Sequence, residues 1–342
     1  MDAKKNTTIL VGILGAGRIG KVHANNIASM RNAAIKYISD PYINDETRDW
    51  IASLRGPIAT TDADCVINDP EIDAIIICSP TDTHTNYIIK AADAKKHIFC
   101  EKPIALDASS TVKALAAVER AGVKLQVGFV RRFDHNHRKI RDYVVDGRIG
   151  EPHIVKITSR DPERPPMEYV KTSGGIFADM MIHDFDMAYY LAGCEVEEVY
   201  AAGSALIDAQ FAEYGDVDTA AVTLKFANGA LGCIDNSRET LYGYDQRTEV
   251  FGSKGCAIVT NDMPNTCLLT SADGVRGDKP LWFFLERYND AFIAEMASFF
   301  DAVSNDTEPL VTGCDALRSI RIAMAAKRSL KEGRPVKISE ID

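Results

Sequence analysis

Residues 9–20 read Ile-Leu-Val-Gly-Ile-Leu-Gly-Ala-Gly-Arg-Ile-Gly, and this stretch decides the fold of the first part of the chain. Its apolar beginning, Ile9–Leu14, is typical of a strand in a parallel sheet that is covered on both faces. Gly15, Gly17 and Gly20 follow as G-x-G-x-x-G. The first glycine permits a tight turn, the second lets a pyrophosphate approach the backbone, and the third lets helix and strand pack closely. The pattern predicts a dinucleotide site at a helix N-terminus, although a tight turn alone also needs glycine.

An acidic residue follows at the distance expected for an NAD site. Asp40 ends the second predicted strand, twenty positions after Gly20, where a carboxylate can bind the adenine ribose hydroxyls. The same carboxylate would repel a 2′-phosphate, so the sequence favours NAD over NADP. Arg18 and Ile19 open the helix. Arg18 either neutralises a phosphate or is a solvated helix residue.

The first part of the chain alternates apolar strands with segments of helical period. The predicted strands are Ile9–Leu14, Ile35–Ser39, Ala74–Cys78, Ile98–Cys100 and Leu125–Phe129. Repeated β-α units predict right-handed crossovers and a sheet with helices on both faces. We therefore expect an α/β Rossmann domain with a doubly wound parallel sheet over residues 1–130.

After Gly150 the pattern changes to strands in direct succession. The predicted strands are His153–Ser159, Val199–Ser204, Thr219–Phe226, Ala230–Asn236, Thr248–Phe251 and Cys256–Thr260, with helices near Ile176–Leu191, Glu286–Val303 and Asp315–Lys331. Asn228-Gly229 predicts a tight hairpin turn. Residues 131–342 are expected to form an α+β domain with a large, mainly antiparallel open sheet. The last helix either stays with this domain or packs back on the first.

Composition excludes several classes of protein. At 342 residues the chain is long enough for about two domains. Its 46% hydrophobic and 26% charged residues exclude a disordered or fibrous chain. The net charge of -10 argues against nucleic acid as a partner. The early apolar run is too short for a membrane span or a signal peptide, so we expect a cytoplasmic protein with no membrane partner.

The eight cysteines predict neither a disulfide framework nor a metal cluster. No two form a Cys-x-x-Cys pair, and several lie within apolar runs, as Cys78 and Cys100 do. We therefore expect small buried side chains in a reducing compartment.

A second chemical signal is Glu101-Lys102-Pro103, directly after the predicted strand Ile98–Cys100. In an open α/β sheet, the carboxyl ends of the strands face the ligand crevice. Lys102 is therefore a candidate for contact with bound molecules. By itself, such a tripeptide is more often a surface turn.

A third signal lies in the helix predicted near Ile176–Leu191. Asp179 and His183 are four residues apart and therefore share one face of that helix. A carboxylate beside an imidazole is a general-base arrangement. Two other interpretations stay open: a capped histidine in the core, and a metal site made of Asp179, His183 and Asp186.

Together these segments resemble the glucose–fructose oxidoreductase/inositol dehydrogenase family over essentially the whole chain. The shared segments are GAGRIG at 15–20, SPTDTH at 79–84, EKP at 101–103, VGFVRRFD at 127–134 and the helix with Asp179 and His183. The segments GGIF at 174–177, DNSR at 235–238 and YGYD at 242–245 look most like the myo-inositol 2-dehydrogenase branch. Val130 departs from the Asn or Met that related enzymes often have there, which weakens the assignment of a particular polyol.

The resemblance implies an NAD-dependent oxidoreductase that needs no metal. Lys102, Asp179 and His183 match the residues that carry the reaction in that family. His183 would accept the hydroxyl proton, Asp179 would hold the imidazole, and Lys102 would stabilise the reacting oxygen. The implied substrate contacts are Lys102, Arg131, Asp161, Asp179, His183, Tyr242 and Tyr244. The implied cofactor contacts are Gly15, Gly17, Arg18, Ile19, Gly20, Asp40, Ser79, Pro80, Thr81, His84, Glu101 and Lys102.

The expected reaction is oxidation of myo-inositol at its axial hydroxyl to the 2-keto product, scyllo-inosose. The resemblance also implies inositol catabolism and a homotetramer built on the open face of the second domain's sheet. Within the family, the alternative is a dehydrogenase of scyllo-inositol or of another cyclic polyol or sugar. A non-catalytic NAD(H)-binding regulator is the alternative from another class, but a sensor has no need of the complete catalytic set. Arg131 could also simply pair with Asp134, and the two tyrosines could simply close a hairpin.

Overall fold

The structure is a computed structural model that describes residues 8–54 and 56–341. The chain divides into two compact units. The first comprises Met1–Val130 and Asp290–Leu317, and the second comprises Arg131–Asn289 and Arg318–Asp342. A helix from late in the sequence, α12 (Asn289–Asn305), therefore belongs almost entirely to the first unit.

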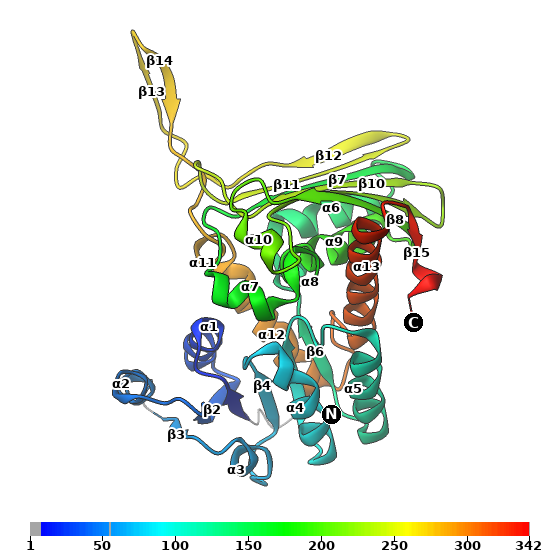
Figure 1. Ribbon diagram of the computed structural model, residues 1–342. Helices are drawn as coiled ribbons and strands as arrows, with labels where there is room; N and C mark the ends of the chain where they lie inside the picture. Colours follow the sequence, from blue (N-terminus) through cyan, green and yellow to red (C-terminus); the bar gives the residue numbers. More distant parts are fainter. Residues whose placement is uncertain (1–7, 55, 342) are drawn as a thin grey trace. The chain divides into compact units, whose positions relative to one another are not determined.

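A six-stranded parallel sheet forms the centre of the first unit, in the order β3-β2-β1-β4-β5-β6 (Figure 1). This is the strand order of doubly wound dinucleotide-binding domains. The strands are β1 (Ile9–Leu14), β2 (Ala33–Ser39), β3 (Ile58–Thr60), β4 (Ala74–Ile77), β5 (His97–Glu101) and β6 (Leu125–Gly128). The helices between them are α1 (Arg18–Ala28), α2 (Asp45–Ser53), α3 (Ala63–Ile67), α4 (Thr81–Asp93) and α5 (Ala108–Ala121).

The core of the first unit is built from strands that are apolar on both faces. All four residues of β4 are fully buried, as the continuous apolar run predicts. Met296, Phe299 and Phe300 of α12 pack into the same cluster as Val11 and Ile76. The predicted α/β class and its five strands are confirmed. The short strand β3 was not predicted, because three half-exposed residues carry no readable period.

The second unit contains a seven-stranded mixed sheet, in the order β12-β11-β7-β10-β9-β8-β15. Only the pair β7 and β10 is parallel, and the other neighbours are antiparallel. The strands are β7 (Pro152–Arg160), β8 (Val196–Ser204), β9 (Thr219–Phe226), β10 (Leu231–Ser237), β11 (Asp245–Gly252), β12 (Gly255–Val259) and β15 (Val336–Lys337). The predicted α+β class with a mainly antiparallel sheet is confirmed.

Helices cover one face of this sheet and leave the other open. The helices of this unit are α6 (His135–Val145), α7 (Met167–Ser173), α8 (Gly175–Asp179), α9 (Ile182–Ala192), α10 (Gln210–Glu213), α11 (Phe284–Arg287) and most of α13 (Gly313–Glu332), and single 3₁₀ turns lie at Val130–Phe133 and Ile338–Glu340. α9 packs on β7 and α6 packs on β12 (Figure 1). Buried and exposed residues alternate along β9, as expected for a strand with one solvated face.

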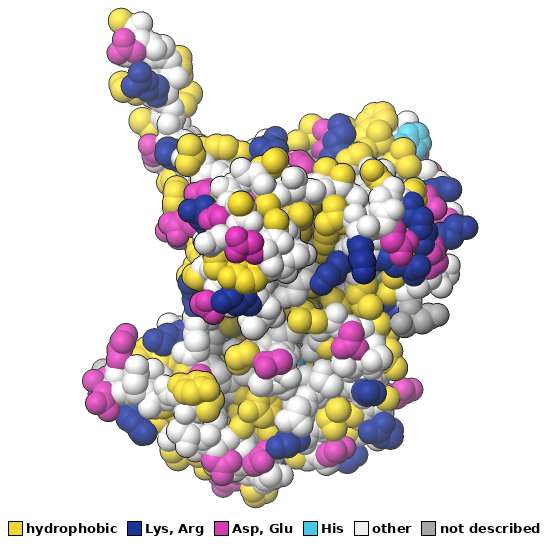
Figure 2. Space-filling model, viewed as in Figure 1, with side chains coloured by type: hydrophobic (Ala, Val, Ile, Leu, Met, Phe, Trp, Pro, Cys, Tyr) yellow, Lys and Arg dark blue, Asp and Glu magenta, His cyan; other side chains and the backbone are white. Residues whose placement is uncertain are grey.

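A small hairpin extends from the second unit beside this sheet (Figure 1). It consists of β13 (Leu268–Ser271) and β14 (Gly274–Gly277), and every residue of both strands is exposed. Apolar side chains lie on its surface, as Figure 2 shows, and Leu268, Leu269 and Val275 are among them. This hairpin was not predicted, because all residues of its four-residue strands are exposed and give no alternation of apolar and polar residues.

Two predicted helices are each interrupted in the structure. The helix near Ile176–Leu191 is two helices, α8 and α9, because the backbone N–H groups of Met180 and Met181 both donate to the carbonyl of Ile176. The second of these bonds spans five residues, so the α-helical ladder ends there. The helix near Glu286–Val303 is likewise divided into α11 and α12.

The cysteines differ from the sequence prediction. Cys78 and Cys100 are buried, as expected. Cys65, Cys233, Cys256, Cys267 and Cys314 are exposed, so the prediction of buried side chains is wrong for them. In the sheet, Cys233 and Cys256 lie on the outer face of strands whose other face is buried, which a short apolar run does not reveal. Within the described ranges, no helix is long and apolar enough to cross a bilayer.

Candidate active site

The glycine-rich turn between β1 and α1 leaves room for a ligand. Gly15 has φ of 105°, and a Cβ there would lie 2.6 Å from the backbone of Cys78, so only glycine fits. Gly17 caps α1, and a Cβ on it would meet none of the described atoms within 4 Å. Arg18, Ile19 and Gly20 form the first turn of this helix, whose N–H groups suit a phosphate. The turn therefore fits the pyrophosphate of a dinucleotide.

Asp40 lies next to this turn, directly after β2. One carboxylate oxygen accepts a hydrogen bond from the backbone N–H of Ala16 at 2.8 Å. The other accepts from the backbone N–H of Tyr42 at 2.9 Å. These two bonds fix the carboxylate beside the glycine turn, where the sequence predicted a ribose contact.

The predicted cofactor contacts after β4 are tied to the segment after β5. Pro80 caps α4, Thr81 is its first residue, and the hydroxyls of Ser79 and Thr83 are hydrogen-bonded at 2.5 Å. His84 is buried, and its ring nitrogens lie 2.8 Å from the carbonyl oxygens of Pro103 and Ser79. Burial lowers the pKa of His84. Its imidazole thus links two loops at the carboxyl end of the sheet.

Glu101 and Lys102 stand at the end of β5. Glu101 is the last residue of the strand, and Lys102 follows it at a partly exposed position. The side chain of Glu101 is hydrogen-bonded to Nε2 of His23 on α1 at 2.7 Å. The predicted position of Lys102 at a strand end is confirmed for this sheet.

Asp179 of the second unit has two strong hydrogen-bond donors that the sequence analysis did not identify. The hydroxyl of Tyr169 donates to Oδ1 at 2.8 Å, and Nη1 of Arg238 donates to Oδ2 at 2.8 Å. Asp179 is the last residue of α8 and His183 is the second residue of α9. The prediction that both lie on one uninterrupted helix is therefore wrong, and their pairing stays a prediction.

Asp161 follows β7 near the same charged groups. Burial raises the pKa of Asp161 to about 6, Arg238 acts against this shift, and the negative charge of Asp179 adds to it. Carboxylates with raised pKa values next to charged partners are common in functional sites. Asp161 is thus a predicted substrate contact whose buried, charged surroundings change its ionisation.

Arg131 belongs to a buried polar network in the second unit. Its Nη1 donates to Ser159 Oγ at 3.1 Å and also to the carboxylate of Asp184. Asn236 donates to the other oxygen of Asp184 at 2.7 Å. The alternative pairing of Arg131 with Asp134 is wrong.

Asp134 and Asp186 have arginine partners of their own. Arg287 donates to Asp134 at 2.6 Å, and His137 contacts the same carboxylate at 2.8 Å. Arg132 donates to Asp186 through Nε and Nη2, at 2.9 and 2.6 Å to the nearer oxygens. The bidentate ion pair of Asp186 gives no support to a metal site with Asp179 and His183.

The two predicted substrate tyrosines have different surroundings. Tyr244 is buried and packs edge-to-face against Phe283 and Tyr288. Burial raises the pKa of Tyr244 well above its usual value, and the positive charge of Arg131 acts against this shift. Tyr242 is exposed, and its hydroxyl donates to Asp245 at 2.7 Å. Tyr242 lines a surface hollow of about 840 Å³ with Arg160.

Sequence reasoning missed Tyr169, Arg238 and Asp184 as site residues. Arg238 was quoted only as part of the segment at 235–238, and no role was inferred for it. Its position directly after β10 was the available signal, since strand ends collect functional residues. Tyr169 lies on a short helix with no motif, so nothing in the sequence singled it out.

Comparison with known proteins agrees with these features. Residues 9–129 match the oxidoreductase family with an NAD-binding Rossmann fold, and residues 137–258 match the GFO/IDH/MocA C-terminal domain. The chain is 52% identical over 334 residues to an uncharacterized oxidoreductase of Bacillus subtilis, which covers 98% of each chain. It is 47% identical over 331 residues to the myo-inositol 2-dehydrogenase of Thermotoga maritima, which covers 97% of this chain and 99% of the relative.

A solved structure with bound ligands is also similar. Scyllo-inositol dehydrogenase from Lactobacillus casei, crystallised with NAD(H) and scyllo-inositol, matches with a TM-score of 0.90 and 29% identity. The match covers 97% of this chain and 100% of that chain. With its glycine turn, Asp40 and full-length relatives, the chain belongs to the GFO/IDH/MocA family and is an NAD-dependent oxidoreductase.

Proposed function

We propose that this protein oxidises myo-inositol to 2-keto-myo-inositol (scyllo-inosose) with NAD as the hydride acceptor. The choice of substrate is carried by the full-length similarity to the Thermotoga maritima myo-inositol 2-dehydrogenase. Bound NAD supplies the nicotinamide carbon that takes the hydride. The glycine turn and the oriented Asp40 carboxylate support its binding to the first unit.

His183 is the proposed general base in the second unit. It accepts the proton of the substrate hydroxyl, and Asp179 orients the imidazole and stabilises its protonated form. Asp179 is itself held by Tyr169 and Arg238. A carboxylate has about four lone-pair sites, so these two bonds leave capacity for the ring of His183.

Lys102 is the proposed donor to the reacting oxygen. Its ammonium stabilises negative charge that develops as the hydroxyl proton leaves, which is most effective in a site with little water. We expect no metal requirement, and exhaustive chelation is expected to leave turnover unchanged.

Four further side chains are the proposed polyol contacts: Arg131, Asp161, Tyr242 and Tyr244. Asp161 has the best support, because its raised pKa still leaves it ionised at neutral pH, ready to accept hydroxyl hydrogen bonds. Arg131 and Tyr244 are buried within each other's electrostatic reach. Tyr242 has the weakest support, because its hydroxyl already donates to Asp245.

The open face of the seven-stranded sheet supports a homotetramer as part of the same proposal. Tyr200, Leu231, Phe251 and Ile258 are exposed. The strand register places all four on the outer face. An exposed apolar surface of this kind is typical of a protein interface. Phe251→Glu is therefore expected to reduce the sedimentation coefficient to that of a smaller oligomer, and an unchanged coefficient would argue against this face.

A substrate panel tests the proposed reaction. NADH formation is followed with myo-inositol, scyllo-inositol, other inositols, glucose and xylose at saturating NAD. We expect the highest kcat/KM with myo-inositol. A higher value with scyllo-inositol would favour the alternative that the Lactobacillus casei structure suggests. NAD binding without turnover of any polyol would favour a regulator.

A further inference from the structure

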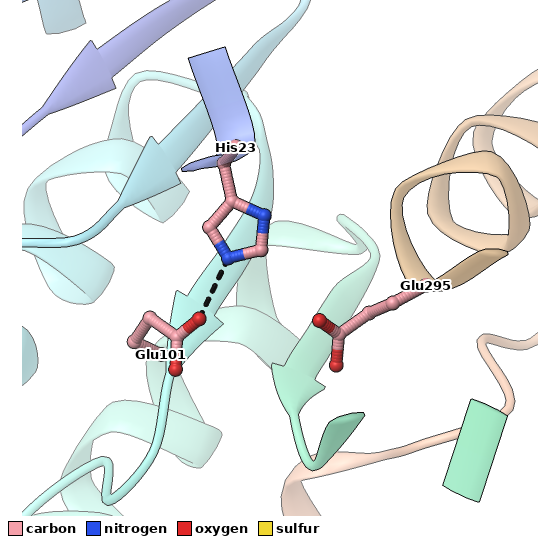
Figure 3. Close-up of side chains that lie close together, drawn as sticks. All are labelled: His23, Glu101 and Glu295. Carbon is pink, nitrogen blue, oxygen red and sulfur yellow. Dashed lines mark hydrogen bonds and ion pairs between the residues drawn. The ribbon is translucent and has the colours of Figure 1, made fainter. Parts of the chain in front are cut away.

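Three ionisable side chains meet inside the first unit. His23 comes from α1, Glu101 from the end of β5 and Glu295 from α12 (Figure 3). One ligand atom from each lies within 4.8 Å of the other two. The Nε2 of His23 and the Oε1 of Glu101 are 2.7 Å apart, which is a hydrogen bond.

Glu295 completes this cluster without a bond of its own. It is fully buried, and within residues 8–54 and 56–341 neither carboxyl oxygen has a hydrogen-bond partner. Figure 3 shows its carboxyl group directed toward Glu101 and His23. The side chain of His23 is also fully buried, whereas Glu101 is 12% exposed.

The surrounding residues hold the cluster in place. Gln126 of β6 donates from its side chain to the backbone carbonyl of Glu295 at 2.8 Å, which fixes that turn of α12. Gly128 pairs with Glu101 across the sheet, and a Cβ at Gly128 would lie 2.9 Å from the Glu101 carboxylate. The rings of Phe99 and Phe292 pack edge-on against His23. The site is thus shaped around one carboxylate and closed by apolar rings.

Two ionised carboxylates in this enclosure would be strongly unfavourable, so either a proton or a cation must compensate one charge. The 2.7 Å separation of His23 Nε2 and Glu101 Oε1 is that of a direct hydrogen bond, whereas neither oxygen of Glu295 has a hydrogen-bond partner among the described residues. The carboxyl group of Glu295 is therefore the one that most needs a proton to be buried there. Burial and the negative charge of Glu101 raise the pKa of Glu295 well above its usual value. The nearby thiols of Cys78 and Cys100 stay neutral, because burial raises their pKa values too.

We propose that Glu295, as a neutral carboxylic acid, and His23 are positioning residues that fix the Glu101 carboxylate and thereby orient the adjoining Lys102. This role rests on the proposed function of Lys102 as the donor to the reacting oxygen. The carboxylate of Glu101 is held from α1 by His23 and faces Glu295 of α12, and Lys102 follows it directly. None of the three side chains needs to touch substrate.

The protonation of Glu295 is tested by stability, without any substrate. An acid whose pKa is raised by folding stabilises the protein fully below its unfolded pKa and loses that contribution as pH rises. Glu295→Gln keeps the shape but cannot ionise. Its Tm relative to wild type should therefore increase from about pH 4 upward, by at least about 2 °C at neutral pH. A Tm difference between the two proteins that stays constant, or that falls as the pH rises, would show that Glu295 is not protonated in the folded protein.

The positioning role is tested with Glu295→Leu, which removes the carboxyl group. Misplacing Lys102 should lower kcat by about 10- to 100-fold while NAD affinity stays the same. Glu295→Gln should restore most of this loss. The control is Ile38→Ala, a fully buried position on β2 that should lower Tm without a comparable loss of kcat. If Glu295→Leu and Ile38→Ala lose kcat equally, Glu295 contributes only to packing and does not orient Lys102.

Hydrogen exchange separates this inference from the proposed reaction. Peptides that cover residues 97–104 should exchange faster in Glu295→Leu than in Ile38→Ala, whether or not any polyol is oxidised. Unchanged exchange would contradict the positioning role even in an active enzyme. Addition of Zn²⁺ or Mn²⁺ tests the other means of charge compensation. If either ion raises the Tm of the wild type but not that of Glu295→Leu, the cluster is a metal site and the proposal of a protonated Glu295 is wrong.

Discussion

Arg238 and Asp179 form a buried ion pair, with Nη1 of the arginine 2.8 Å from Oδ2 of the carboxylate. The arginine side chain is only 3% exposed and the aspartate 12%. Tyr169 donates to the other carboxylate oxygen, so both oxygens are held from elements other than α8 itself. Asp179 stands where α8 ends, and these partners fix a carboxylate that the helix alone would leave free to rotate.

Removing the arginine should therefore harm both stability and catalysis. Arg238→Met leaves the Asp179 charge buried without its cation, which typically costs about 3–5 kcal/mol of unfolding free energy. Tyr169→Phe removes one neutral donor to the same charged carboxylate and should cost less, about 1.5–3 kcal/mol. Chemical denaturation measures both losses. If Arg238→Met keeps the stability and the kcat of the wild type, the ion pair neither stabilises the fold nor positions the Asp179 carboxylate.

Asp40 should set the choice of dinucleotide. Its carboxylate is fixed beside the glycine turn by the N–H groups of Ala16 and Tyr42, so it cannot easily rotate away from a 2′-phosphate. Wild-type kcat/KM should be higher with NAD than with NADP. Asp40→Ala should lower the ratio of kcat/KM with NAD to kcat/KM with NADP. Steady-state kinetics with both cofactors gives the answer. Equal kcat/KM values in the wild type would contradict this role.

The pKa of Asp161 predicts a specific dependence of stability on pH. The carboxyl group keeps its proton up to about pH 6 in the folded protein, but the unfolded chain releases it near the ordinary value of 3.8. The protonated Asp161 therefore contributes fully to the free energy of unfolding below its pKa in the unfolded chain. This contribution is lost as the pH rises through its pKa in the folded protein. Asp161→Asn should gain roughly 1–3 kcal/mol relative to wild type between about pH 4 and pH 7. If the free energies of unfolding of the two proteins depend on pH in the same way, folding does not shift the pKa of Asp161.

The proposed base and donor should give different kinetic signatures. His183 must be neutral to accept a proton, so kcat/KM should rise with pH through one ionisation of the free enzyme. His183→Ala should lower the rate by about 10²–10⁴ and flatten the acidic limb. Lys102→Ala should lower kcat by about 10²–10³ and leave NAD binding intact. If His183→Ala keeps near-normal turnover and the same limb, another residue is the base.

The fold of the first unit was largely predictable because its strands are buried on both faces. Each such strand is an apolar run that is readable in the sequence, and Ile9–Leu14 matches β1 at both ends. In the second unit one face of each strand is solvated, and an outward residue such as Cys233 can itself be apolar, so the sequence does not show which residues are buried. The division of α8 from α9 was not predictable, because it depends on where two N–H groups find a carbonyl rather than on a helix-breaking residue.

The candidate site was predictable where a motif carries it. The glycine turn and Asp40 lie together because one strand and one turn place them, and both are local in the sequence. Arg238 reaches Asp179 across 59 positions of the chain, and Glu295 reaches the cluster with Glu101 from α12. Such partners are brought together by tertiary packing alone, so composition and spacing give no sign of them.

The most direct test of the proposed reaction is the fate of one hydrogen atom. Myo-inositol that carries deuterium on the carbon of its axial hydroxyl is incubated with enzyme and NAD, and the reduced cofactor is analysed by mass spectrometry. Transfer of hydride from that carbon predicts one deuterium atom in each molecule of NADH formed, together with a 2-keto product. Reduced cofactor without deuterium, or no reduced cofactor at all, would contradict oxidation of myo-inositol at this position.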